Sequence, residues 1–184
     1  MLEDLSPPYD VVLADPPWSY YGAPDKWGAA AKFYPTMPTS EIADLPIADL
    51  LARRAVVFVW TTSSQLPEAL DVLSAWKLYY RGIAFVWVKT TLAGVPIKAQ
   101  GVRPSITKPL TELVVAGSTV ARGRPLPLSD EGVCQTVFAL KAEHSAKPDA
   151  VQERIEAMYP NVRKLELFAR RRRAGWDAWG DEVQ

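Results

Sequence analysis

The fold is decided by the stretch Tyr9-Asp10-Val11-Val12-Leu13-Ala14-Asp15-Pro16-Pro17-Trp18. Its run from Val11 to Ala14 is short, continuously apolar and preceded by Pro7-Pro8, which is typical of a buried strand. Pro16 and Pro17 each fix φ at about −65° and lack an amide donor. We therefore expect a buried strand that ends in a rigid turn, with Asp15 and Trp18 presented at the end of a sheet.

Similar apolar runs recur along the chain and alternate with helical patterns. They predict five further strands, at residues 55–60, 83–88, 113–116, 135–139 and 164–168. Apolar residues at helical spacing predict a helix over 64–76, and Pro46 divides 40–53 into two short helices. Another helix is expected over 149–158, with Pro148 at its first position. This alternation predicts an α/β fold with a mainly parallel sheet and helices on both faces.

Two predicted loops are longer than ordinary connections, at residues 19–38 and 93–109. Loops of this length in a compact domain are either mobile or functional. Ligands of open α/β sheets bind beyond the carboxyl ends of the strands, and the first loop begins at such an end. We expect the functional site there.

Composition limits the class of protein. The chain has 184 residues, which suits one domain over 1–184, and its net charge is zero. No apolar run reaches the roughly 18 residues that cross a membrane, and Glu3 and Asp4 argue against a secretory signal. One cysteine, Cys134, and one histidine, His144, exclude an internal disulfide and disfavour a metal site. We expect a cytoplasmic protein that does not coat nucleic acid non-specifically, although zero net charge is compatible with an enzyme that grips a few phosphates.

The turn after the first strand suits one kind of chemistry. An exocyclic amino group offers two N–H donors, which the Asp15 carboxylate and the Pro16 carbonyl could accept, since no local amide is expected to compete for them. Trp18 could stack on a base that has left its helix. The alternative is that Pro16-Pro17 only terminates the strand and that Trp18 only packs.

The chain resembles the MT-A70 family of adenine N6-methyltransferases in an ordered series of motifs over residues 9–182. The resemblance implies a Rossmann-like methyltransferase fold that binds S-adenosyl-L-methionine, with the target-amine turn before the donor-binding strand. The motifs are 9–18, Tyr34-Pro35-Thr36-Met37, Val57-Phe58-Val59-Trp60-Thr61, Val86-Trp87-Val88-Lys89-Thr90, Thr111-Glu112-Leu113, Ser145-Ala146-Lys147-Pro148-Asp149, Lys164-Leu165-Glu166-Leu167-Phe168-Ala169-Arg170 and Gly175-Trp176-Asp177-Ala178-Trp179-Gly180.

By this resemblance the strand at 164–168 carries the acidic residue that binds the methyl donor, and Glu166 stands at the position of that residue. Lys147 is expected to contact the methionine carboxylate of the donor or the target site, and Arg170 its ribose or carboxylate. Asp181 and Glu182 follow Trp179-Gly180, where relatives carry amides near the ribose. The expected donor contacts are Asp15, Lys147, Glu166, Phe168, Arg170, Asp181 and Glu182.

The same resemblance makes Tyr34 part of a lid over the base, while Lys89 is expected to face the substrate groove. The run Arg171 to Arg173 replaces a histidine-asparagine pair of eukaryotic relatives. It could grip phosphates or be a solvated basic surface, and the sequence leaves both open. The expected substrate contacts are Trp18, Tyr34, Lys89, Arg103, Lys108, Arg171, Arg172 and Arg173.

We expect methyl transfer to the N6 amino group of adenine in DNA by a homodimer, with Asp15, Pro16, Pro17 and Trp18 as the catalytic residues and no metal. The loop at 93–109 is the expected interface or groove element. An RNA adenine methyltransferase would use the same pocket. The pattern also leaves open a cytosine N4-methyltransferase and a non-catalytic partner that only binds nucleic acid, although the intact Asp15 and Trp18 argue against such a partner.

Overall fold

The computed structural model describes residues 2–19, 36–98, 106–141, 146–181 and 183. Tyr34, Arg103, His144 and Glu182 lie outside these ranges. So do most of the first long loop and the middle of the second.

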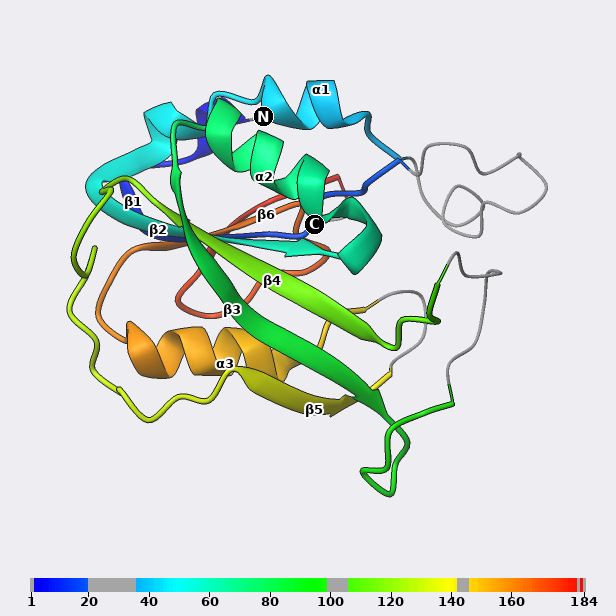
Figure 1. Cartoon of the computed structure of the whole chain (residues 1–184). Helices are drawn as coiled ribbons and strands as arrows, with labels where there is room; N and C mark the ends of the chain where they lie inside the picture. The colour runs from blue at the N-terminus through cyan, green and yellow to red at the C-terminus, as the bar shows by residue number, and fades with distance from the viewer. Residues whose placement is uncertain (1, 20–35, 99–105, 142–145, 182, 184) are drawn as a thin grey trace.

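The described residues form one seven-stranded sheet in the order β5-β3-β4-β2-β1-β6-β7 (Figure 1). β1 pairs in parallel with both β2 and β6, as do β3 with β5 and β6 with β7. Only β4 runs antiparallel to its neighbours, β2 and β3. The predicted mainly parallel sheet is therefore confirmed. The strands are β1 (Tyr9–Ala14), β2 (Leu51–Thr61), β3 (Tyr79–Thr90), β4 (Thr111–Ser118), β5 (Thr136–Leu140), β6 (Lys164–Leu167) and β7 (Asp177–Trp179).

Helices cover both faces of this sheet, as predicted. α1 (Thr39–Ala43) and α2 (Leu66–Ala75) lie on one face, and α3 (Asp149–Met158) lies on the other (Figure 1). Short 3-10 turns are η1 (Leu2–Asp4), η2 (Ile47–Leu50) and η3 (Ser63–Gln65). None of the helices in the described ranges is long and apolar enough to cross a membrane.

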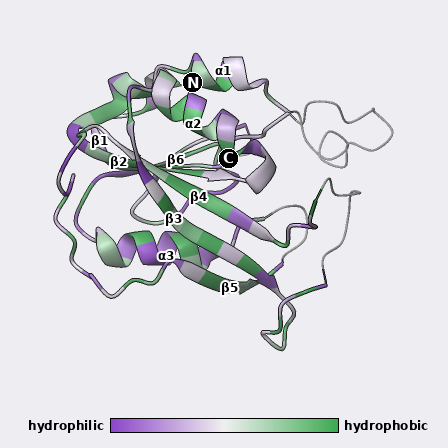
Figure 2. Cartoon of the chain, viewed as in Figure 1, coloured by the Kyte–Doolittle hydropathy of each residue, from purple (hydrophilic) through white to green (hydrophobic). Residues whose placement is uncertain are grey.

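The core has two halves because side chains of a strand alternate between its faces. Val12 and Ala14 of β1 pack in the cluster under α1 and α2, whereas Val11 and Leu13 pack with α3. Figure 2 shows that the central strands are mostly hydrophobic, while α3 carries both hydrophobic and hydrophilic residues. The continuous apolar run that identified β1 therefore reflects burial on both sides.

Three details differ from the sequence prediction. The second of the two short helices at 40–53 is only the turn η2, because β2 already begins at Leu51, where it pairs with Tyr9. Pro148 precedes the first turn of α3 in an extended conformation instead of starting the helix. β7 was not predicted, since three half-exposed residues without an apolar run give no strand signal.

The segment between β6 and β7 is held against α3 by charged contacts. Glu156 of α3 accepts two hydrogen bonds from Arg173, at 2.7 and 3.0 Å, and one from the indole of Trp176 at 2.7 Å. Asp149, at the start of α3, pairs with Arg171 and Arg173. These contacts fix the path that leads from β6 to β7.

We expect Glu156→Ala to lower the free energy of unfolding by about 1–2 kcal/mol at neutral pH, since it removes hydrogen bonds to a charged group that solvent partly reaches. The hydrogen bond from Arg173 is the main reason that the pKa of Glu156 lies below its usual value. The loss should therefore shrink as the pH falls through that lowered pKa. Urea unfolding measures the effect, with the exposed Glu153→Ala of the same helix as the control. Equal losses in the two variants would contradict the stabilising role of the Glu156 contacts.

Candidate active site

A pocket of about 340 Å³ opens where the parallel strands β1, β2 and β6 end. The start of β4 reaches the same edge, because β4 runs the other way: Leu113 lies beside Thr61, the last residue of β2. This is the edge at which α/β sheets bind ligands. The lining residues are Asp15, Pro16, Pro17, Trp18, Thr36, Met37, Glu41, Trp60, Thr61, Thr62, Glu112, Lys147, Phe168, Ala169, Arg170, Trp179, Gly180 and Asp181.

The turn after β1 is fixed by several hydrogen bonds. The amide of Met37 donates to the carbonyl of Pro17 at 2.8 Å, and the indole of Trp18 donates to the carbonyl of Trp60 at 2.9 Å. Trp18 is only 6% exposed and packs in the core below α1 and α2. The turn and the ring of Trp18 are thus held in place by β2 and by the chain before α1.

One expectation about this turn is wrong. The carbonyl of Pro16 does have a local amide partner, since the amide of Trp18 donates to it at 2.8 Å. Pro17 has no N–H donor, but Trp18 has one, and the turn is tight enough for this N–H to reach the Pro16 carbonyl. A carbonyl oxygen has two lone pairs, so the oxygen of Pro16 can still accept one further donor.

Four side chains of alternating charge lie next to one another, and three of them line the pocket. The ammonium group of Lys147 lies 3.0 Å from Asp15 Oδ1 and 3.4 Å from Glu112 Oε2. The other carboxylate oxygen of Glu112 lies 2.5 Å from the Lys89 ammonium group. Lys147 also sits 5.6 Å from the centre of the Trp60 ring. Two carboxylates and two ammonium groups therefore offset one another in a place that solvent only partly reaches.

The two carboxylates respond differently to this environment. Burial raises the pKa of Asp15 above its usual value, and the Lys147 charge offsets only part of the effect. Burial acts on Glu112 in the same direction, but the lysines on both sides of it outweigh burial and hold the pKa of Glu112 below its usual value. Glu112 thus stays ionised to lower pH than an ordinary glutamate, because the lysines lower its pKa, whereas burial makes the charge of Asp15 costly.

The opposite wall of the pocket comes from the ends of β6 and β7. The rings of Phe168 and Trp179 meet edge to face, with their centres 5.3 Å apart. The amide of Ala169 donates to the carbonyl of Trp179 at 2.9 Å, which ties the two strand ends together. Gly180 packs so closely here that an added Cβ would lie 2.2 Å from the Ala169 carbonyl oxygen. Only glycine fits at that position.

Most of the expected catalytic and donor residues meet in this pocket. Glu166 does not line it, because its side chain points to the α3 side of the sheet and accepts a hydrogen bond from Gln152 at 2.8 Å. Burial is the first cause of its raised pKa. The expected residues that do line the pocket are Asp15, Pro16, Pro17, Trp18, Lys147, Phe168, Arg170 and Asp181.

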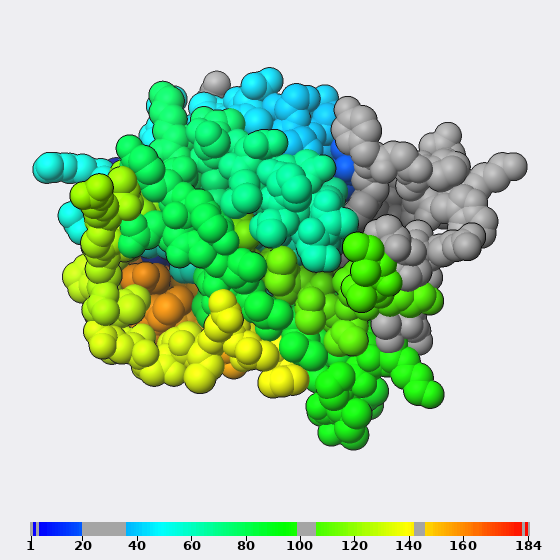
Figure 3. Space-filling model, in the orientation of Figure 1, coloured from blue at the N-terminus to red at the C-terminus, as the bar shows by residue number. Residues whose placement is uncertain are grey.

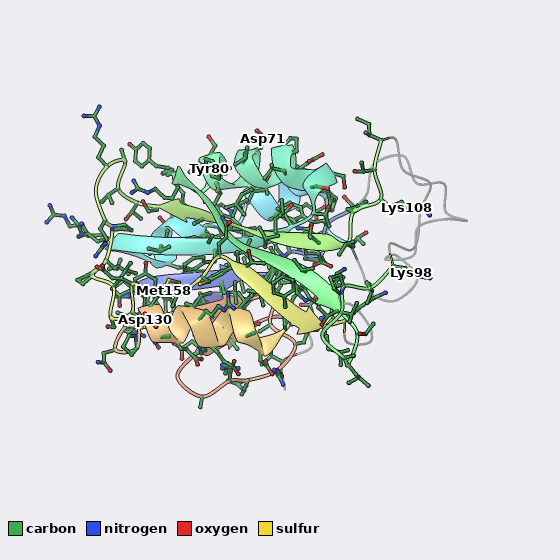
Figure 4. The ribbon with its side chains drawn as sticks, turned by 60° about the horizontal axis from the view of Figure 1, so that its bottom comes forward. Asp71, Tyr80, Lys98, Lys108, Asp130 and Met158 are labelled. Carbon is green, nitrogen blue, oxygen red and sulfur yellow. The ribbon has the colours of Figure 1, made fainter. Side chains whose placement is uncertain are left out.

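The expected substrate contacts are more scattered. Lys89 reaches the pocket only through Glu112, and Arg171 and Arg173 lie against α3 with acidic partners. Arg172 is exposed. Lys108 is exposed too, and it lies at the same end of the molecule as Lys98 (Figure 4).

Sequence reasoning assigned no role to Glu112 or to Trp179 and Gly180, although all three stand in the quoted motifs. A carboxylate at the start of an otherwise apolar strand was the available signal for Glu112. The described parts of the chain contain no group of three or more histidine, cysteine, aspartate and glutamate residues that could hold a metal ion.

The sequence matches the profile of the MT-A70 family over residues 9–182, nearly the whole chain. The protein belongs to the MT-A70 family. Its pocket thus lies in a methyltransferase domain of a family that acts on the N6 position of adenine, and the resemblance inferred from the motifs is confirmed.

The chain is also similar to several named methyltransferases. The type II methyltransferase M.MunI of a Mycoplasma species is 32% identical over 95% of this chain and 78% of its own length. The N6-methyladenosine RNA methyltransferase MTA1 of Pyricularia oryzae is 31% identical over 100% of this chain but only 49% of its own length. The human N(6)-adenine-specific methyltransferase METTL4 is 27% identical over 95% of this chain and 37% of its own. The chain thus spans half or less of the two longer relatives.

We expect Glu112→Gln to lower the free energy of unfolding by about 1–3 kcal/mol at neutral pH, since two lysines lose their shared carboxylate. A carboxylate with a lowered pKa stabilises the fold above its unfolded pKa, and this contribution disappears as the pH falls through the folded pKa. The difference between variant and wild type should therefore vanish in acid. Denaturant titrations across pH test this, with Glu131→Gln of the exposed Arg124–Glu131 pair as the control. A deficit that does not change with pH would rule out the charge explanation.

Proposed function

We propose that this protein transfers a methyl group from S-adenosyl-L-methionine to the N6 amino group of adenine in DNA. The observation that carries the proposal is the position of Asp15, whose carboxylate lines the pocket beside Lys147, the fixed Trp18 and the proline turn. A carboxylate can accept from an amino group and orient it without a covalent intermediate.

The wall formed by β6 and β7 suits the donor. Lys147 and Arg170 can attract a carboxylate, Asp181 can accept from ribose hydroxyls, and Phe168 with Trp179 offers aromatic surface to an adenine ring. The pocket volume of about 340 Å³ falls in the range of small-molecule sites. When bound, the donor supplies a methyl group that is already electrophilic.

The protein's own residues would position the target amine. Asp15 accepts one N–H of the amino group, and the remaining lone pair of the Pro16 carbonyl accepts the other. Held in this way, the nitrogen lone pair points at the methyl group, and such alignment lowers the barrier by several kcal/mol, on the order of 7–11 in the best cases. As the N–C bond forms, the methyl–sulfur bond would break, S-adenosylhomocysteine would leave, and the nitrogen would release one proton to solvent. Lys147 holds the Asp15 carboxylate in place, and Glu112 holds Lys147. The base must first leave its stack.

Support for DNA over RNA comes from the likeness to the type II methyltransferase M.MunI, most of whose length the chain covers. The likeness to the fungal RNA methyltransferase MTA1 favours the alternative, an RNA substrate. Nucleoside mass spectrometry after incubation with the donor and with matched DNA or RNA oligonucleotides distinguishes them. N6-methyldeoxyadenosine is expected. N6-methyladenosine alone would establish the RNA alternative, and no methylated nucleoside from either would overturn the enzymatic proposal.

Asp15→Asn should reduce single-turnover methyl transfer by at least about 100-fold, as expected when one positioned electrostatic group is lost. It should not reduce stability at neutral pH. Burial raises the pKa of Asp15, so the folded state favours the neutral form and its stability falls as the pH rises through that pKa. The amide removes this cost. The wild-type rate should decline in acid as Asp15 is protonated. Near-normal turnover in a folded Asp15→Asn variant would refute the catalytic role.

We further propose that the protein acts as a homodimer. Val95 and Ile106, in the described parts of the 93–109 segment, are 59% and 90% exposed, and Lys98 and Lys108 lie at the same end of the molecule (Figure 4). A two-fold axis would cover the apolar residues and double the basic surface beside the pocket. Size-exclusion chromatography with light scattering should give twice the chain mass at tens of micromolar protein. A monomer under those conditions would exclude a tight dimer.

A further inference from the structure

A second pocket, of about 470 Å³, lies at the other end of the sheet. It is bounded by the middle of β2, the first half of β3, Ala116 near the end of β4, the end of α3, and the segment 119–135 between β4 and β5, which we call the strap. Figure 3 shows a hollow between the strap in yellow, β3 in green and α3 in orange. Figure 4 places Met158, one of its lining residues, at the end opposite to Lys98 and Lys108. The two pockets share no lining residue.

The strap is held over this pocket by hydrogen bonds from both sides. Arg54 of β2 donates to the carbonyls of Arg124 and Pro125, at 2.6 and 2.7 Å. Arg81 of β3 donates to two further strap carbonyls, at 3.0 and 2.6 Å. The amide of Ser129 donates to the carbonyl of Met158, the last residue of α3, at 2.9 Å. Because the strap is pinned at β2, β3 and α3, the space beneath it is a built feature of the fold.

The interior of the second pocket is mainly apolar. Besides the arginines, two polar residues line it: Tyr159, which is only 6% exposed, and the exposed Gln135, whose side-chain amide donates to the carbonyl of Ile83 at 2.5 Å. The Tyr159 hydroxyl can donate one hydrogen bond to a ligand in this pocket. Burial raises the pKa of Tyr159, while the Arg124 charge acts in the opposite direction. The apolar lining residues are Val56, Phe58, Ile83, Ala84, Phe85, Ala116, Pro125, Leu128, Val133 and Met158.

Two arginines give this pocket a positive charge. Arg81 and Arg124 both line it and are exposed. The partners of the Arg81 guanidinium in the described ranges are carbonyls, so no carboxylate there neutralises it. Arg124 pairs with Glu131, but that pair is solvent-exposed and therefore weak. An acidic group at the mouth would meet two guanidinium groups.

We propose that the second pocket binds a small apolar molecule that carries one acidic group. The apolar body packs against Phe58, Phe85 and Met158, and the acid lies near Arg81 and Arg124. The Tyr159 hydroxyl donates a hydrogen bond to this acidic group. The pocket volume is in the range of small-molecule sites, which combine an apolar lining with a few polar groups. The site is independent of the methyl-transfer chemistry.

The test uses 8-anilinonaphthalene-1-sulfonate, an aromatic acid whose fluorescence rises in an apolar site, on the intact folded protein. Saturable binding with one site per chain is expected. Arg124→Gln should weaken it by about two- to fivefold, because the ligand loses a charged but solvent-exposed partner. Arg122→Gln, which removes an equal charge from an exposed strap residue outside the lining, should leave it unchanged. Equal weakening by the two variants, or non-saturable binding, would overturn the proposal.

Two further variants test the interior. Ala84→Leu fills the pocket and should abolish binding, while Tyr159→Phe keeps the ring and should weaken binding severalfold. Thermal unfolding identifies any variant that fails to fold. If either of these two does, the comparison of Arg124→Gln with Arg122→Gln decides whether the proposal stands. Competition separates the ligand classes: decanoate should displace the probe, and decanol, which lacks the acid, should not. Displacement by both to the same extent would refute the role of the arginines.

Discussion

Lys147 joins two partly buried carboxylates, Asp15 at 3.0 Å and Glu112 at 3.4 Å, which come from different parts of the sheet. Two carboxylates this close to one another repel, and both lose solvation. A cation between them makes the arrangement stable, and each carboxylate in turn gives the lysine a partner. The candidate site therefore depends on three segments meeting at one point: the turn after β1, the start of β4 and the chain just before α3.

The topology of the sheet explains why these segments meet. β1 and β2 are parallel and end at the same edge. β4, the antiparallel strand beside β2, begins at that edge, so a residue at the start of β4 lies level with residues that follow the other strands. With β4 parallel, Glu112 would lie at the opposite end of the sheet. The reversed strand thus supplies the site with its second carboxylate.

The sequence left open whether the arginine run after β6 binds phosphates or is a solvated surface, and tertiary contacts bear on that choice. Arg173 is engaged by Glu156 at 2.7 and 3.0 Å, and Arg171 pairs with Asp149. Partners this close reduce the net positive charge that these two side chains offer to a phosphate. Meanwhile Arg170, one residue earlier, lines the pocket. Neighbouring arginines therefore have different surroundings. After the end of β6, the chain first lines the pocket at Arg170 and then runs along α3 at Arg171 and Arg173.

The sequence alone determined the parts of this protein that depend on local patterns. Apolar runs gave six of the seven strands and their α/β arrangement, since burial on both faces leaves a direct mark on composition. The stretch from Tyr9 to Trp18, with the later motifs, gave the family and the residues Asp15, Lys147 and Arg170 of the pocket. Only the tertiary structure decided the rest. The role of Glu112 depends on the direction of β4, the orientation of Glu166 depends on which face α3 covers, and the short β7 forms because β6 offers it a paired edge. Such features arise from contacts between residues far apart in the chain, and no local pattern encodes them.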